Sequence, residues 1–160
     1  MARQHRTPQF STDDLTSARM KKVPSSDTKP EMLVRRVLWR FGYRYCTDQR
    51  DLPGRPDVVL PKHGCIVLVH GCFWHRHRCR AGQSFPASNV EQWEAKFNRT
   101  RERDRRNVNK LRRLGWRVLV VWECQLTDIA QLATKLVRFI EGDDATMQGR
   151  RLRRLGGWSP

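Results

Sequence analysis

Groups that could bind metals or move protons are concentrated between Gly54 and Cys79. This 26-residue stretch contains four histidines and three cysteines. Asp57 stands directly before the apolar residues 58–60, and a second apolar run, 65–69, leads into His70. Residues 61–64 read as a hairpin turn between two strands. An acid at one strand end and histidines at the end of its neighbour suit a metal-assisted hydrolytic site.

The individual roles follow from ligand chemistry. Asp57 is the best candidate for a Mg²⁺ ligand, because hard cations prefer oxygen and substrate phosphates can complete the shell. His75 and His70 flank the same end of the hairpin, and a histidine can take a proton from water. Asp104 could fix the tautomer of His75. Each residue alone also allows a structural role, as a turn acid or a packed histidine, but their convergence favours function.

A second set has metal-ligand character. Cys72, His77 and Cys79 lie close in sequence, and Cys124 follows the last predicted strand. Four soft or borderline ligands suit tetrahedral Zn²⁺ with no position left open for catalysis. The spacing is not that of a common zinc finger. The alternative is three buried free cysteines and an exposed histidine.

The charge points to a polyanionic partner. The chain has 32 Lys and Arg against 16 acids, a net charge of +16, and a pI near 10.9. Nucleic acid is the favoured partner, and a solubility surface or a ribosome-associated tail is the alternative. Residues 76–113 hold 12 Lys or Arg, among them Arg101 and Arg105, which we predict to contact DNA. Phe73, Trp74 and Trp93 beside this segment could be core residues or wedges that enter a base stack.

Composition also bounds the setting. No run of about 18 apolar residues is present, so we expect no membrane span. The first residues lack the apolar region of a signal peptide. An odd count of five cysteines, three at metal-like positions, indicates a reducing cytoplasm rather than a disulfide framework.

The predicted elements form one α/β domain. A capping box at Thr28 and Glu31 should open a helix that ends near Gly42. Residues 43–47 could form a strand before the central hairpin, and after residue 79 we expect a loop up to about residue 88. A basic helix over about 90–114, a strand over 116–122 parallel to its neighbour, and a helix over 126–140 complete the domain. The core-facing stripe of the long helix is predicted to contain Phe97, Arg101, Asp104, Val108 and Leu111.

Three regions result. Residues 1–27 are predicted to be a flexible arm that could contact DNA, residues 28–141 the catalytic domain, and residues 142–160 a flexible basic tail.

Four segments resemble the very-short-patch repair (Vsr) mismatch endonucleases. They are LPGRPDVV, VHGCFWHRHRC, RDRRN and LGWRVLVVWEC, in the family's order and spacing. The resemblance implies a restriction-endonuclease-like core with a central mixed sheet flanked by helices and a structural zinc site. It implies a Mg²⁺-dependent enzyme that nicks one DNA strand 5′ of the thymine in a T·G mismatch left by 5-methylcytosine deamination.

The resemblance also assigns residues. Asp57 falls on the Mg²⁺ ligand, His75 on the general base, Asp104 on its paired acid, His70 on a second histidine and Glu31 on a nearby acid. The zinc ligands are matched by Cys72, His77, Cys79 and Cys124. The intercalating aromatics are matched by Phe73, Trp74 and Trp93, and Met20 matches an N-terminal wedge.

Some positions depart from the family pattern. Val69 replaces a threonine, so the metal would use its backbone carbonyl.

The implied partners are duplex DNA, the mismatch-repair protein MutL and a cognate cytosine-5 methyltransferase. We expect a monomer in the bacterial cytoplasm, associated with the nucleoid. A non-catalytic zinc-stapled DNA-binding module and a restriction-type nuclease for unmismatched sites remain as alternatives.

Overall fold

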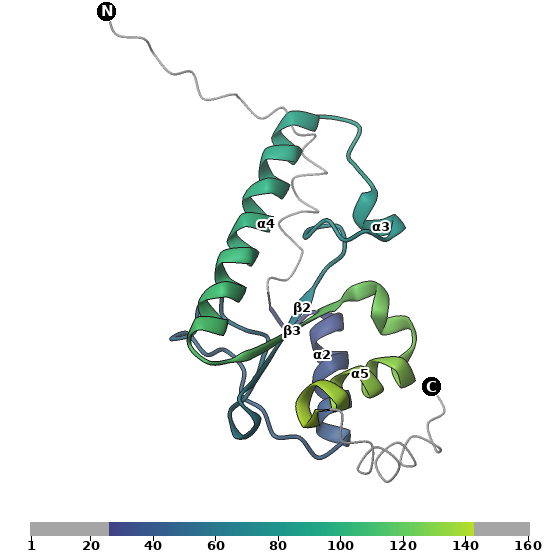
Figure 1. Cartoon of the computed structure of the whole chain (residues 1–160). Helices are drawn as coiled ribbons and strands as arrows, with labels where there is room; N and C mark the ends of the chain where they lie inside the picture. Colours follow the sequence, from purple (N-terminus) through teal and green to yellow (C-terminus); the bar gives the residue numbers. More distant parts are fainter. Residues whose placement is uncertain (1–25, 143–160) are drawn as a thin grey trace, which may run out of the picture.

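The computed structural model describes residues 26–142 (Figure 1). Predictions for Met20, for the arm up to residue 25 and for the tail from residue 143 lie outside the described residues. In chain order the elements are α2 (Lys29–Arg40), β1 (Val58–Leu60), the 3-10 turn η1 (Pro61–His63), β2 (Cys65–His70), α3 (Arg80–Gln83), α4 (Val90–Arg113), β3 (Arg117–Trp122), the 3-10 turn η2 (Glu123–Thr127) and α5 (Ile129–Glu141). None of the helices within residues 26–142 combines the length and the apolar composition needed to cross a bilayer.

The three strands form one mixed sheet in the order β1-β2-β3. β1 and β2 are antiparallel, joined through η1 and Gly64, whose φ of 60° is left-handed and suits glycine. β2 and β3 are parallel, and α4 makes the crossover between them. The predicted hairpin and the predicted parallel neighbour are therefore confirmed. In the β2–β3 register His70 is the partner of Trp122, so the two side chains lie at the same end of the sheet.

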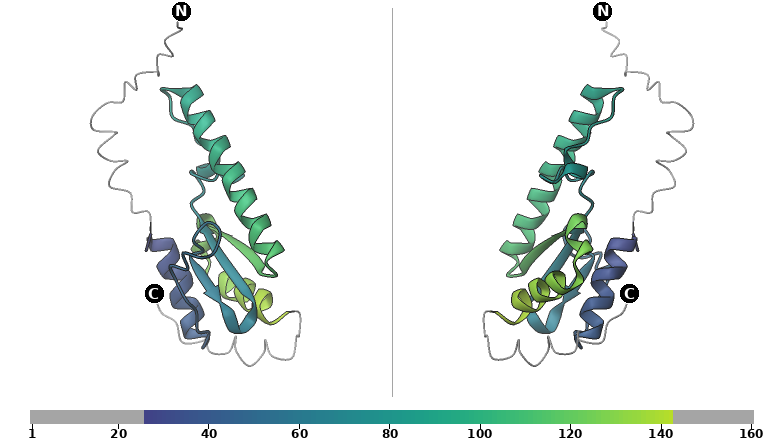
Figure 2. Two further views of the ribbon diagram at one scale, coloured as in Figure 1. Left: turned by 90° about the vertical axis from the view of Figure 1, so that its left-hand side faces the viewer. Right: turned by 90° about the vertical axis from the view of Figure 1, so that its right-hand side faces the viewer.

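Helices cover both faces of the sheet (Figure 2). On one face α2 and α5 pack on Val58, Leu60, Val67 and Val121 through buried residues such as Val34 and Leu136. On the other face α4 packs on Val59, Ile66 and Leu68 through Leu111. Adjacent strand residues point to opposite faces and both faces are covered, which is why residues 58–60 and 65–69 are apolar throughout. The long α4 extends beyond the sheet, alongside the segment that contains α3 (Figure 1).

Several local predictions were wrong. Residues 43–47 form no strand, and only Cys46 pairs with Val59 through two backbone hydrogen bonds of 2.8 and 2.9 Å. Asp48 has a φ of 52°, which interrupts an extended backbone soon after this bridge. A four-residue helix, α3, lies in the segment predicted as loop. The last helix begins at Ile129 because the Asp128 side chain accepts a hydrogen bond of 2.9 Å from the Gln131 N–H.

The first helix begins near the predicted residue but by another contact. The Thr28 hydroxyl donates to Glu31 Oε1 at 2.8 Å, and the Thr28 side chain accepts no backbone hydrogen bond. The predicted capping box is therefore wrong, because the Thr28 hydroxyl donates to the Glu31 side chain instead of accepting from a backbone N–H. Glu31 instead faces inward and is only 6% exposed.

Candidate active site and metal centre

Asp57 precedes β1 and reaches across to β2. Its Oδ2 atom accepts a hydrogen bond of 2.7 Å from the backbone N–H of Val69. Burial, with a smaller contribution from the charge of nearby Glu31, raises the pKa of Asp57 to about 6 against the opposing effects of the Val69 N–H and the Arg35 charge. A half-buried carboxylate with this bias favours a proton or a cation beside it.

Arg35 supports this acid, and the sequence reasoning missed it. Its guanidinium donates to the backbone carbonyl of Asp57 at 3.2 and 3.3 Å and to Glu31 Oε2 at 3.4 Å. Glu31 also accepts from the Asp27 N–H at 2.9 Å, so both of its oxygens are engaged. Through Arg35, Glu31 anchors the segment that carries Asp57. The signal was present, because Arg35 follows Glu31 by one helical turn on the face that packs inward.

His75 and Asp104 form a close polar pair. His75 Nδ1 lies 2.5 Å from Asp104 Oδ2, which confirms the predicted partner of Asp104. Burial alone would raise the pKa of Asp104, but the hydrogen bond and charge of His75 hold it below its ordinary value. With Nδ1 engaged, the Nε2 atom of His75 is the one left to exchange a proton.

His70 stacks on His75. The ring centroids are 3.9 Å apart and the planes differ by 10°. Burial, followed by the neighbouring His75, lowers the pKa of His70 to about 4, so this ring is neutral near pH 7. A neutral ring stacked on His75 avoids two adjacent positive charges.

These groups come from four separate segments. Ligand atoms of His70, His75 and Asp104 lie within 4.8 Å of one another, and Asp57 is bound to the backbone N–H of Val69, the residue before His70. Asp57 lies before β1, His70 ends β2, His75 lies in the loop that follows, and Asp104 lies midway along α4. The predicted stripe of α4 holds for Phe97 and Leu111, which are buried, and for half-buried Asp104, but Arg101 is exposed. A charged side chain with no buried partner stays in solvent.

The predicted metal ligands also meet. One ligand atom from each of Cys72, His77, Cys79 and Cys124 lies within 4.8 Å of the others. The Nδ1 atom of His77 lies 3.4 Å from Cys124 Sγ and 3.9 Å from Cys72 Sγ. The Cys124 N–H donates to Cys72 Sγ at 3.3 Å. Two thiols, a third thiol from the start of η2 and one imidazole fit tetrahedral Zn²⁺.

The thiol environment agrees with a cation there. Burial raises the pKa of Cys72 to about 12, whereas the hydrogen bond with His77 lowers that of Cys79 to about 6. A buried thiol becomes a thiolate only when a positive charge compensates it, and a metal ion shared by Cys72, His77, Cys79 and Cys124 would supply that charge. The Cys/His set could therefore bind zinc.

The aromatic residues form a cluster beside α4. Phe73 packs edge-on against Trp74 and buried Phe97, with centroids 5.2 and 5.3 Å apart. Trp74 and Trp93 are 6.1 Å apart, and Lys96 Nζ lies 5.0 and 4.9 Å above their rings. Phe73, Trp74 and Trp93 are half-buried. They join the loop to α4 while keeping part of each ring accessible.

The exposed side chains of α4 are strongly basic. Arg101 and Arg105 are exposed, as the predicted DNA contact requires. A shallow surface on the same helix is lined by Lys96, Arg99, Thr100, Glu102, Arg103 and Arg106. This surface has the charge that a phosphate backbone attracts.

Comparison with known proteins identifies the class. The family described as DNA mismatch endonuclease Vsr matches residues 10–81. A type II nicking enzyme of Xanthomonas oryzae is 42% identical over 81% of this chain and 98% of its own length. The DNA mismatch endonuclease Vsr of Escherichia coli is 39% identical over 82% of this chain and 87% of its own length, and a Neisseria meningitidis nicking enzyme is 40% identical over 81% and 94%.

The chain belongs to the family of Vsr DNA mismatch endonucleases. As a member of that family it is a DNA endonuclease.

Proposed function

We propose that this chain nicks one strand of duplex DNA on the 5′ side of the thymine in a T·G mismatch, using Mg²⁺. The observation that carries the proposal is the convergence of Asp57, His70, His75 and Asp104 from four segments of the fold. A binding module would have no task for a hydrogen-bonded His–Asp pair next to a half-buried acid.

His75 is the general base in this proposal. Asp104 holds Nδ1, so Nε2 accepts the proton of the attacking water. Asp57 and the backbone carbonyl of Val69 would hold Mg²⁺, which supplies charge neutralisation at the scissile phosphate when bound. Neutral His70 stacks on His75 and holds its ring in place. Glu31 binds Arg35, which in turn binds the backbone carbonyl of Asp57.

The other assigned residues grip the substrate. Arg101 and Arg105 would contact phosphates, and Phe73, Trp74 and Trp93 would enter the base stack at the mismatch. Lys96, close above two of these rings, supports their placement beside the DNA charge. Zn²⁺ on Cys72, His77, Cys79 and Cys124 would be structural, because four protein ligands leave no open position.

The wider setting is inferred from the family. The α/β core with a mixed sheet is compatible with a restriction-endonuclease-like fold. The domain would run over 28–141, between a DNA-contacting arm with Met20 at residues 1–27 and a basic tail at residues 142–160. MutL and a cytosine-5 methyltransferase are the proposed partners of a monomer in the bacterial cytoplasm, near the nucleoid.

A nicking assay tests the proposal. End-labelled T·G, T·A and C·G duplexes are incubated with the protein and Mg²⁺ and resolved on a denaturing gel. We expect one cut, in the thymine strand of the T·G duplex. Binding without cutting would favour the zinc-stapled DNA-binding module, and cutting of both strands in matched duplexes would favour a restriction-type nuclease.

A further inference from the structure

The side chain of Trp122 lies between two groups of titratable residues. One is the metal set, Cys72, His77, Cys79 and Cys124, and the other is His70, His75 and Asp104. The Trp122 ring stacks on the metal-set residue His77, with centroids 4.4 Å apart and planes differing by 24°. The same ring lies edge-on to His70, with centroids 5.4 Å apart and planes differing by 78°. An unbroken series of ring contacts therefore runs from His77 through Trp122 and His70 to His75.

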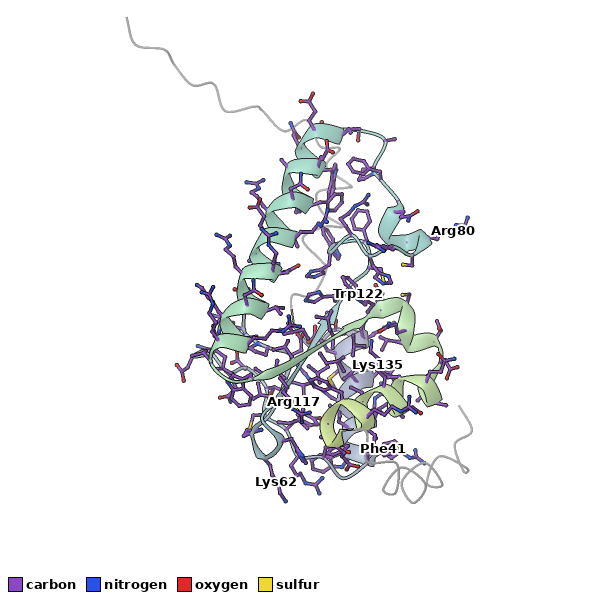
Figure 3. The ribbon with its side chains drawn as sticks, in the orientation of Figure 1. Phe41, Lys62, Arg80, Arg117, Trp122 and Lys135 are labelled. Atoms are coloured by element: carbon purple, nitrogen blue, oxygen red, sulfur yellow. The ribbon has the colours of Figure 1, made fainter. Side chains whose placement is uncertain are left out.

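Strand pairing explains this position. Trp122 ends β3 and is the register partner of His70, which ends the parallel strand β2. Paired residues of neighbouring strands point to the same face, so the indole is placed beside the His70 ring. Figure 3 shows Trp122 at the end of β3 that is opposite to Arg117.

Trp122 is also fixed by the turn η2 that follows it and contains Cys124. Its backbone N–H donates to Gln125 Oε1 at 3.2 Å, and Lys135 Nζ donates to the same oxygen at 2.7 Å. Cys124, two residues on, belongs to the metal set and donates its N–H to Cys72 Sγ. The turn that carries a metal ligand thus also fixes the tryptophan.

We propose that Trp122 is a positioning residue for the reaction. It holds the ring of His70, and through it the ring of His75, in a fixed position relative to the metal set. This inference rests on the proposed function, since it assigns Trp122 to the same site. Trp122 reaches no reacting atom, so it acts through the two histidines. It also stands between His77 and His70, which keeps one histidine with the metal set and the other with the catalytic pair.

Three variants separate positioning from simple packing. Trp122→Leu removes the aromatic contacts, and Trp122→Phe keeps a ring. Trp116→Leu is the matched control, because Trp116 is also half-buried but lies just before β3, at the opposite end of that strand from Trp122, where it packs against the cluster of Val59, Ile66, Leu68 and Leu111. For each variant, zinc content, the affinity for a T·G duplex and the single-turnover nicking rate at saturating protein are measured.

We expect Trp122→Leu to retain its zinc, to bind the T·G duplex within about threefold and to nick roughly 10–100-fold more slowly, the usual effect of losing a residue that orients a ligand or catalytic group. Trp122→Phe should recover most of the rate, and Trp116→Leu should keep it. A normal rate for Trp122→Leu, or an equal loss in Trp116→Leu, would overturn the proposal. So would a loss of rate that zinc loss alone accounts for.

A spectroscopic measurement keeps this test independent of activity. The ring C–H signals of His75 are recorded by NMR in each chain. Positioning is supported if the parent and Trp116→Leu each give one sharp set of His75 ring signals and Trp122→Leu gives broadened or doubled ones. An unchanged His75 set in Trp122→Leu overturns it. If the parent fails to nick any duplex, the proposed function falls, and the NMR comparison still decides the role of Trp122.

Discussion

His75 Nδ1 and Asp104 Oδ2 lie 2.5 Å apart, and this contact joins the metal-ligand loop to the middle of α4. It engages Nδ1 of His75, so Nε2 is the nitrogen that the proposed general base would use. We expect Asp104→Asn to lower the nicking rate by about 10²–10⁴-fold, because an amide can favour the wrong tautomer of the base. DNA affinity should change little.

Single-turnover nicking and equilibrium binding of Asp104→Asn check this prediction. Glu91→Gln is the control, since Glu91 is an exposed acid on the same helix and lies outside the basic surface around Arg103. Equal rates for Asp104→Asn and the parent chain would remove Asp104 from the mechanism.

Asp57 should make stability depend on pH. Burial raises its pKa from 3.8 to about 6. Between these values the folded chain holds more protons at this carboxyl than the unfolded chain, so its contribution to the free energy of unfolding falls as pH rises. Without added Mg²⁺, Asp57→Asn should be more stable than the parent by about 1–3 kcal/mol near pH 7.5, because the amide still accepts from Val69 without a buried charge.

Urea unfolding of both chains at about pH 5 and pH 7.5 measures this difference, which should shrink at the lower pH. His70, whose pKa is lowered to about 4, contributes the opposite slope in both chains, so only the difference between the two chains is diagnostic. Asp51→Asn, at an exposed acid, is the control. A difference that stays the same at both pH values would contradict the assignment of a raised pKa to Asp57.

The cysteines allow a clean test of the metal set. We predict one tightly bound Zn²⁺ per chain, with Cys124→Ser losing it. The loss of stability should be several kcal/mol, since structural zinc contributes about 10–16 kcal/mol of apparent binding energy in small zinc-dependent folds. Cys46→Ser should keep both zinc and stability, because Cys46 is exposed and outside the set. Elemental analysis and thermal unfolding decide, and a fully active chain without zinc would refute the prediction.

Trp74 should matter more for the mismatched duplex than for the matched one. A T·G pair is easier to unstack than a matched pair, so we expect Trp74→Ala to cost roughly 1–3 kcal/mol of T·G binding and less of T·A binding. Trp39→Ala is the control, an exposed tryptophan on α2 across the sheet. Equal losses for both duplexes would make Trp74 a general contact or a core residue.

Arg101 and Arg105 should behave differently from Trp74. Replacing either by Gln should weaken binding to all duplexes alike, because phosphate contacts carry no sequence information. The slope of the logarithm of the binding constant against the logarithm of the salt concentration should become shallower by about one. Binding of T·G and T·A duplexes at several salt concentrations measures this. A loss confined to the T·G duplex would instead assign these arginines to mismatch recognition.

Local pattern predicted much of this molecule. The bounds of β2 match because the apolar run 65–69, with His70 at its end, stands between Gly64 and Gly71. The pairing of His75 with Asp104 followed from the helical spacing of α4, which turns Asp104 inward. The Cys/His set was recognisable from ligand chemistry. Predictions for Met20 and for both ends of the chain remain predictions.

What sequence reasoning missed depends on contacts distant in the chain. Arg35 matters because it reaches the carbonyl of Asp57, 22 residues away, and Trp122 matters because strand register sets it beside His70. The strand predicted for residues 43–47 failed because a bridge at Cys46 alone is not continued by its neighbours.

The most direct test of the account is a strand-resolved cleavage of the T·G duplex. Each strand is labelled in turn, and the parent chain and Asp57→Asn are compared with and without Mg²⁺ under single-turnover conditions. We expect one Mg²⁺-dependent nick 5′ of the mismatched thymine by the parent chain, and none by Asp57→Asn despite T·G binding within about tenfold of the parent, since phosphate contacts come mainly from Arg and Lys. Nicking by Asp57→Asn at the parent rate, or cleavage of the guanine strand, would contradict it.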